Sequence, residues 1–269
     1  MPQPWICVTC GVQFAPSTEP PQHCPICEDD RQYVGLAGQS WTTMDQLQSA
    51  HRNVFTEEEP GLWSIRTDPN FAIGQRAYLI QTPEGNLLWD CITLLDDATV
   101  HQIQALGGIQ ALAVSHPHYY SAMASWSAAF HNAPIFIHEA DRQWIAQPSP
   151  NLHFWSGNQH PLFAGIQLIR SGGHFDGYQV AHWPAAANGA GALFAGDQPQ
   201  VCLDRRWVTF MYSYPNWIPF NATQVRAITA SLAPLPFDRL YGAFGRNLLS
   251  DAKAIIARSE ERYLRAIAG

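Results

Sequence analysis

A short apolar run that ends in two histidines decides the fold. Residues 109–121 read IQALAVSHPHYYS, which places His116 and His118 directly after the apolar stretch. The apolar stretch predicts a buried strand, and residues 120–130 predict a helix. Two histidines at i and i+2 on a loop between a strand and a helix can bind one metal ion with both imidazoles. A pair of exposed loop histidines explains the pattern equally well.

Two later motifs carry a third histidine and a carboxylate. Residues 171–177 read SGGHFDG, so His174 lies among glycines between two predicted strands. Residues 193–197 read LFAGD, which puts Asp197 straight after a short apolar strand. Each motif alone also fits a plain turn, with His174 as a turn residue and Asp197 as a turn former or helix cap.

Hydrophobic periodicity predicts alternating strands and helices from residue 62 onward. An acidic loop is expected at 57–61, and a capped helix at 42–47. The predicted strands are 63–66, 77–81, 87–90, 109–114, 135–138, 165–170, 179–183, 192–195 and 239–241, and the further helices are 99–106, 120–130, 223–232 and 250–268, with another beginning at 141–146. Two β-then-α halves favour two sheets enclosed by helices.

The order of the three motifs within this alternation resembles the metallo-β-lactamase superfamily, over roughly residues 62–269. The stretch 173–177 with 180–184 looks especially like that family's third-histidine strand pair. The resemblance implies an α/β fold, the αββα sandwich. It also implies a metal site of His116, His118 and His174 with Asp197 as the usual bridge, and it places Asp90 beneath the metals.

The chain departs from the family pattern where a second metal would bind. The family's loop usually reads His-x-His-x-Asp-His, but Tyr120 and Ser121 stand at its last two ligand positions. Phe244 falls where the family's last histidine would be. We therefore expect a single metal ion, with these three residues in the vacated second site. Tyr120 is the candidate catalytic residue, as a hydrogen-bond partner or weak acid, although a phenol with a pKa of about 10 is a poor base. A role as mere pocket wall is equally consistent with the sequence.

Four cysteines crowd into the N-terminal segment. Two C-x-x-C pairs, Cys7 with Cys10 and Cys24 with Cys27, are separated by 13 residues. Two such pairs complete a tetrahedral shell of four thiolates that suits zinc or iron. Because the shell is closed, zinc there is expected to be structural; a pair of disulfides is the alternative.

The cysteine segment resembles zinc ribbons and, more distantly, rubredoxins. The second resemblance rests on Trp5-Ile6-Cys7 and Cys24-Pro25-Ile26-Cys27, and it keeps iron and electron transfer open. We predict a zinc ribbon over 1–38 and a metallo-β-lactamase-like domain over 39–269.

Composition limits the classes of partner. The 269 residues are 46% hydrophobic and 14% charged, with a net charge of -7 and no basic run, so nucleic acid is not an expected partner. No apolar stretch is long enough for a membrane span, and the N-terminus lacks the features of a signal peptide. The expected location is the cytoplasm.

Aromatic and arginine residues follow Asp197 and predict substrate contacts. In the family this segment often borders the active cleft, and such side chains suit a substrate with a carboxylate or a ring. A lid packed on its own aromatics is the alternative. The predicted substrate-binding residues are Arg206, Trp207, Tyr212 and Tyr214.

The leading functional hypothesis is a mononuclear zinc hydrolase acting on a small ester, lactone, thioester or amide. The alternative is a non-catalytic descendant that uses the fold for binding and the ribbon for a protein partner. The expected partners are a small-molecule substrate for the enzyme, and a protein partner through the ribbon or a homodimer. A third hypothesis is redox chemistry with iron in both sites, as in the flavodiiron proteins, but the chain has no flavodoxin-like segment.

Overall fold

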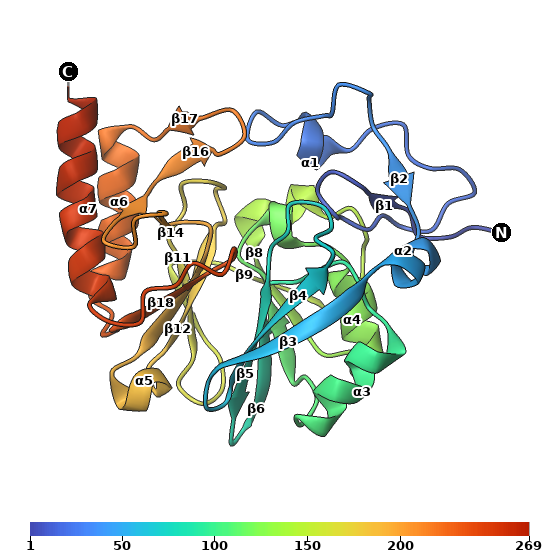
Figure 1. Ribbon diagram of the computed structural model, residues 1–269, viewed down its shortest axis with the longest axis horizontal. Helices are drawn as coiled ribbons and strands as arrows, with labels where there is room; N and C mark the ends of the chain where they lie inside the picture. The colour runs from blue at the N-terminus through green and yellow to red at the C-terminus, as the bar shows by residue number, and fades with distance from the viewer. Residues whose placement is uncertain (269) are drawn as a thin grey trace. The chain divides into compact units, whose positions relative to one another are not determined.

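The computed structural model describes residues 1–268 and divides them into two compact units (Figure 1). The first unit holds residues 1–137 and 141–154, and the second holds 138–140 and the chain from 155 onward. Each unit has one large sheet with its own helices, which confirms the predicted α/β fold class.

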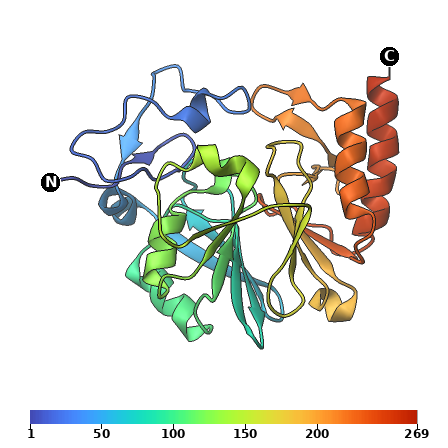
Figure 2. The same cartoon turned by 180° about the vertical axis from the view of Figure 1, so that it is seen from behind.

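The first unit is built on a seven-stranded sheet in the order β3-β4-β5-β6-β7-β8-β9. The strands β6, β7 and β8 are parallel, and α3 (Asp97–Ala105) and α4 (Met123–Ala129) connect them. Because such crossovers are right-handed, two successive ones in the same direction place both helices on one face, as Figure 2 shows. The strands are β3 (Arg52–Glu59), β4 (Leu62–Asp68), β5 (Ala77–Thr82), β6 (Gly85–Trp89), β7 (Ala111–Ala113), β8 (Ile135–His138) and β9 (Leu152–Trp155).

The acidic loop expected at 57–61 is wrong, because its three glutamates belong to β3. Glu57 and Glu59 pair with β4 across a bulge, and only Pro60 and Gly61 form the turn. The strand lies at the edge of the sheet, where charged residues discourage pairing with another chain. Glu57 is exposed, whereas Glu58 accepts from the Ser64 hydroxyl at 2.7 Å and pairs with Arg76. The run of charged residues therefore suggested a loop where the chain forms an edge strand.

The N-terminal segment has the arrangement of a small zinc ribbon and belongs to the first unit. Its elements are β1 (Ile6–Cys7), α1 (Pro25–Glu28) and β2 (Trp41–Thr42), with β1 and β2 antiparallel. The predicted capped helix is confirmed as α2 (Met44–Ala50), with a capping box between Thr43 and Gln46. Ile6, Leu47 and Leu94 form one buried cluster, so the ribbon shares a core with α2 and with the loop between β6 and α3.

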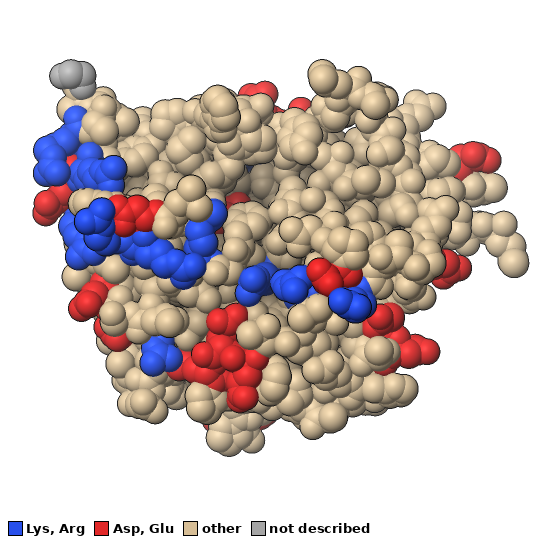
Figure 3. Space-filling view, viewed as in Figure 1, with Lys and Arg blue, Asp and Glu red and all other residues tan. Residues whose placement is uncertain are grey.

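The second unit is built on a five-stranded sheet in the order β10-β11-β12-β13-β18. Helices α6 (Ala222–Leu232) and α7 (Ala252–Ile267) pack against each other, and Lys and Arg side chains gather over α7 (Figure 3). The other elements are β10 (Gln159–Pro161), β11 (Gln167–Arg170), β12 (Gln179–Trp183), α5 (Ala186–Gly189), β13 (Ala192–Gly196), β14 (Gln200–Val201), β15 (Val208–Thr209), β16 (Met211–Ser213), β17 (Ile218–Pro219) and β18 (Arg239–Gly242). Among residues 1–268, no helix has both the length and the apolar character needed to cross a membrane.

Candidate metal centres

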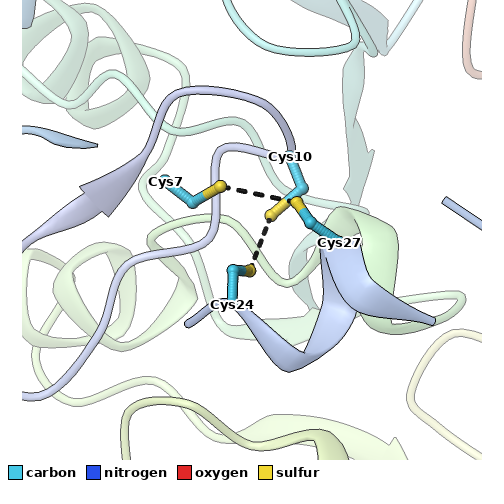
Figure 4. Close-up of side chains that lie close together, drawn as sticks. All are labelled: Cys7, Cys10, Cys24 and Cys27. Carbon is cyan, nitrogen blue, oxygen red and sulfur yellow. Dashed lines mark hydrogen bonds between the residues drawn. The ribbon is translucent and has the colours of Figure 1, made fainter. Parts of the chain in front are cut away.

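The four cysteines of the ribbon converge on one point (Figure 4). The Sγ atoms of Cys7 and Cys27 lie 3.5 Å apart, and those of Cys10 and Cys24 lie 3.7 Å apart. These distances exceed an S–S bond of about 2.05 Å, so the side chains are separate thiols. Four sulfurs about 2.3 Å from a tetrahedral zinc lie about 3.8 Å apart, so the cluster has nearly the dimensions of a zinc site.

The electrostatics of the cluster also favour a cation. Hydrogen bonds from Cys10, Cys24 and Cys27 lower the pKa of the Cys7 thiol, whereas the pKa of Cys10 is raised, chiefly by its hydrogen bond to Cys24. The crowded thiols therefore favour one thiolate stabilised by its neighbours over four mutually repelling charges. A divalent ion would remove this repulsion and allow all four sulfurs to act as ligands.

The histidine pair of the first unit lies on a turn directly after β7. His116 precedes, and His118 lies within, the short 3-10 turn η1 (Pro117–Tyr119). Both side chains are almost completely buried, and their ring centroids lie 5.0 Å apart. This burial argues against the interpretation as an exposed loop pair and leaves both histidines as candidate metal ligands.

Asp90 supports this turn from the end of β6. Its Oδ1 accepts the backbone N–H of Ser115 at 2.7 Å, and its own backbone is left-handed, with φ 57°. The Ser115 Oγ lies 2.9 Å from His116 Nδ1, so Nε2 is the nitrogen that His116 can offer to a metal.

The second unit brings His174 and Asp197 together. His174 follows two glycines with positive φ on the loop between β11 and β12, and Asp197 directly follows β13. A Cβ on Gly173 would meet the side chains of Gln198 and Ile228 at 2.8 Å, so this loop can approach its neighbours only with glycine there. His174 Nε2 lies 4.0 Å from Asp197 Oδ2; two ligands of one tetrahedral ion lie about 3.4 Å apart, so a small inward shift would suffice.

Two buried residues that the sequence motifs did not indicate hold this pair in place. Gln198 accepts the backbone N–H of His174 at 3.0 Å and donates to the Gly172 carbonyl at 2.6 Å. The Tyr178 hydroxyl donates to the Ala195 carbonyl and accepts the backbone N–H groups of Asp197 and Gln198. No spacing rule identifies such residues, because their partners are brought to them only by folding.

Tyr120 and Ser121, at the positions where the family has ligands, are both buried. Burial raises the pKa of Tyr120 well above its usual value, with a further contribution from Asp141, so the phenol stays neutral. Its hydroxyl lies 3.5 Å from the Asp141 carbonyl oxygen. The Ser121 hydroxyl donates to the Cys91 carbonyl and accepts from Gln75 Nε2.

The four predicted substrate-binding residues fall into two groups. Tyr214 donates to the Asp197 carbonyl at 2.6 Å, and its ring lies 6.1 Å from that of His174. Tyr212 packs against Phe220. Arg206 and Trp207 lie instead against α7, where Arg258 donates to the Arg206 carbonyl and Arg262 stacks on the Trp207 ring.

The described residues thus offer four buried cysteines in the ribbon, a buried histidine pair in the first unit, and a buried histidine with an aspartate in the second. No protein-family model matches the chain. The "Uncharacterized protein YmaE" of Bacillus subtilis (strain 168) is 49% identical over 265 residues, which cover 98% of this chain and 96% of that protein. The chain belongs to the YmaE family.

The solved structures to which this YmaE-family chain is similar include metallo-β-lactamases. The DIM-1 enzyme superposes with a TM-score of 0.60 at 14% identity, over 80% of this chain and 98% of its own. FIM-1 from Pseudomonas aeruginosa, solved in a mono-zinc form, gives 0.56 at 13% identity, over 78% and 95%. At these identities the similarity establishes the fold.

Proposed function

We propose that this protein is a metal-dependent hydrolase with one zinc ion bound by His116, His118 and His174, with Asp197 as an additional ligand. The observation that carries the proposal is that each unit presents two buried donors, His116 with His118 and His174 with Asp197. Hydrogen bonds position three of them: Ser115 contacts the His116 ring, Gln198 accepts the His174 backbone N–H, and Tyr178 accepts the Asp197 backbone N–H. The mono-zinc form of FIM-1 supports a single ion in this fold. The proposed substrates are small esters, lactones, thioesters or amides.

The donor set suits the proposed ion. Three neutral imidazoles and a carboxylate are ordinary zinc ligands, and the Ser115 contact orients His116 so that Nε2 can bind. Zinc held there would supply Lewis-acid activation of a carbonyl and of water at neutral pH.

The chain's own side chains limit the remaining roles. Tyr120 stays protonated, so it can donate or exclude water but cannot act as the general base at neutral pH. Ser115 is 1% exposed and its hydroxyl contacts His116, which makes it a positioning group and not a nucleophile open to substrate. Tyr214 packs beside the second-unit pair and is the predicted substrate contact best placed to touch a substrate there.

Hydrolysis assays on zinc-loaded protein test the proposal. Wild type is compared with His118→Ala and with His101→Ala, a control that changes an exposed histidine on α3. We expect turnover of at least one ester, lactone or thioester by wild type and His101→Ala, and none by His118→Ala. Equal rates in wild type and His118→Ala would refute the proposed hydrolase function.

A second candidate function, non-catalytic binding, is favoured by one observation. Tyr120 and Ser121 are buried in contacts within their own unit, where the family would supply a second metal's ligands. A protein that binds one metal at the histidines but turns over no substrate in the screen would support this alternative.

A further inference from the structure

The ribbon is attached to the segment that follows the histidine pair. The backbone N–H of Gln13 donates to the Ser121 carbonyl at 2.9 Å, and the Ser125 hydroxyl donates to Gln13 Oε1 at 2.6 Å. Two residues earlier in the same loop, the Gly11 carbonyl accepts from the Thr93 hydroxyl at 2.8 Å. These contacts all lie within the first unit, and Gln13 is only 3% exposed.

Ser121, which receives the ribbon contact, has an unusual backbone conformation. Its φ is 45°, in the left-handed region that residues with a Cβ rarely adopt, and it lies three residues after His118. Such a conformation persists only where the surroundings enforce it. Here the ribbon binds its carbonyl, while Cys91 and Gln75 bind its hydroxyl.

The loop that makes these contacts is also part of the cysteine cluster. Gly11 directly follows Cys10, and its N–H donates to the Cys7 carbonyl at 2.8 Å. A Cβ on Gly11 would lie 2.5 Å from the Thr93 hydroxyl, so this close approach requires glycine. Binding a metal at the cysteines would therefore order the loop that holds Ser121.

We propose that the ribbon is a positioning element for the histidine pair: a metal bound at the four cysteines fixes residues 11–13, which fix Ser121 and thereby raise the metal affinity of His116 and His118. Gln13 and Thr93 are the positioning residues. The inference rests on the proposed metal site and adds a role for the ribbon within it. Because coupling between two binding equilibria is reciprocal, metal at the histidines also raises the affinity of the cysteines.

A titration of the full chain tests this coupling. Co²⁺ is added to protein whose ribbon already holds one zinc ion, and binding at the histidines is followed by visible absorption. Gln13→Ala removes the Ser125 contact, and Thr93→Val removes the Gly11 contact at nearly constant volume. Ser17→Ala is the matched control, because the Ser17 hydroxyl donates to the Glu19 carbonyl within the ribbon and makes no described contact with the cysteines or the histidine loop.

We expect the double variant to bind Co²⁺ about 5- to 100-fold more weakly, in the usual range of coupling between sites. Thr93→Ser keeps the hydroxyl and should bind Co²⁺ more tightly than Thr93→Val, and Ser17→Ala should bind as wild type does. A folded double variant with affinity within about twofold of wild type would overturn the proposal.

Hydrogen exchange provides a readout that does not need metal at the histidines. In Cys24→Ser, which cannot complete the four-cysteine shell, we expect faster exchange of the amides in residues 115–122 than in zinc-loaded wild type. Unchanged exchange there would overturn the positioning role. Wild type that binds metal only at its cysteines would instead overturn the proposed histidine site, so the two failures are distinguishable.

Discussion

The Tyr178 hydroxyl holds Asp197 in place. That oxygen accepts the Asp197 N–H at 2.9 Å and lies 3.1 Å from the Asp197 carboxylate. We predict that Tyr178→Phe weakens metal binding about 10- to 100-fold, the usual cost of losing a residue that orients a ligand. Isothermal titration with zinc measures this. Tyr263→Phe is the control, because its hydroxyl binds the Phe220 carbonyl; equal losses in both variants would contradict a specific role for Tyr178.

The burial of Tyr120 predicts how the stability of the protein changes at alkaline pH. Burial raises its folded pKa above the unfolded value of about 10, so its stabilising contribution is complete below pH 10 and is lost as pH rises further. Above pH 10, each further pH unit lowers the unfolding free energy by up to about 1.4 kcal/mol. Tyr120→Phe should therefore lose less stability than wild type between pH 9 and 11 in urea unfolding. Parallel losses in the two proteins would show that Tyr120 is not the group responsible.

The sequence predicts most strands of both sheets and most of the helices, because the spacing of apolar residues indicates which face of each element is buried. It misses β3, whose edge position allows the glutamates that suggested a loop. The short hairpins β14–β15 and β16–β17 also carry too few residues for a periodic pattern.

The same limit applies to the candidate sites. Cysteines and histidines are recognisable from fixed spacings, but Gln13, Tyr178 and Gln198 act on residues that are distant in sequence or outside any motif. Their partners are chosen by tertiary packing, which a pattern within one segment cannot report.

The ribbon as an element should depend on its metal. Its small core includes Ile6. The ribbon also carries the part-buried Trp5 and Trp41, and Trp41 packs edge-on against Phe14 with ring centroids 5.1 Å apart. Because a module of this size obtains much of its folding free energy from metal binding, we predict that a strong chelator changes the fluorescence of these tryptophans before the two large sheets unfold. Cys24→Ser should show the changed signal without chelator, and Cys202→Ser, which alters a half-buried cysteine outside the cluster, should not. A single transition for all probes would contradict this order.

The whole molecule should bind two zinc ions per chain, one at the cysteines and one at the histidines. The four sulfurs already have nearly the spacing of a zinc shell, and the three histidines with Asp197 are the donors of the proposed second site. Tyr120 and Ser121 lack the charge and the accessibility to hold a third ion. We therefore expect metal analysis to give two zinc ions for wild type, one each for Cys24→Ser and His118→Ala, and none for the variant that combines them. Three ions in wild type would show that the histidine region still binds a metal pair. If wild type and His118→Ala each contain one zinc ion, that ion is bound at the cysteines and the histidine site does not bind zinc.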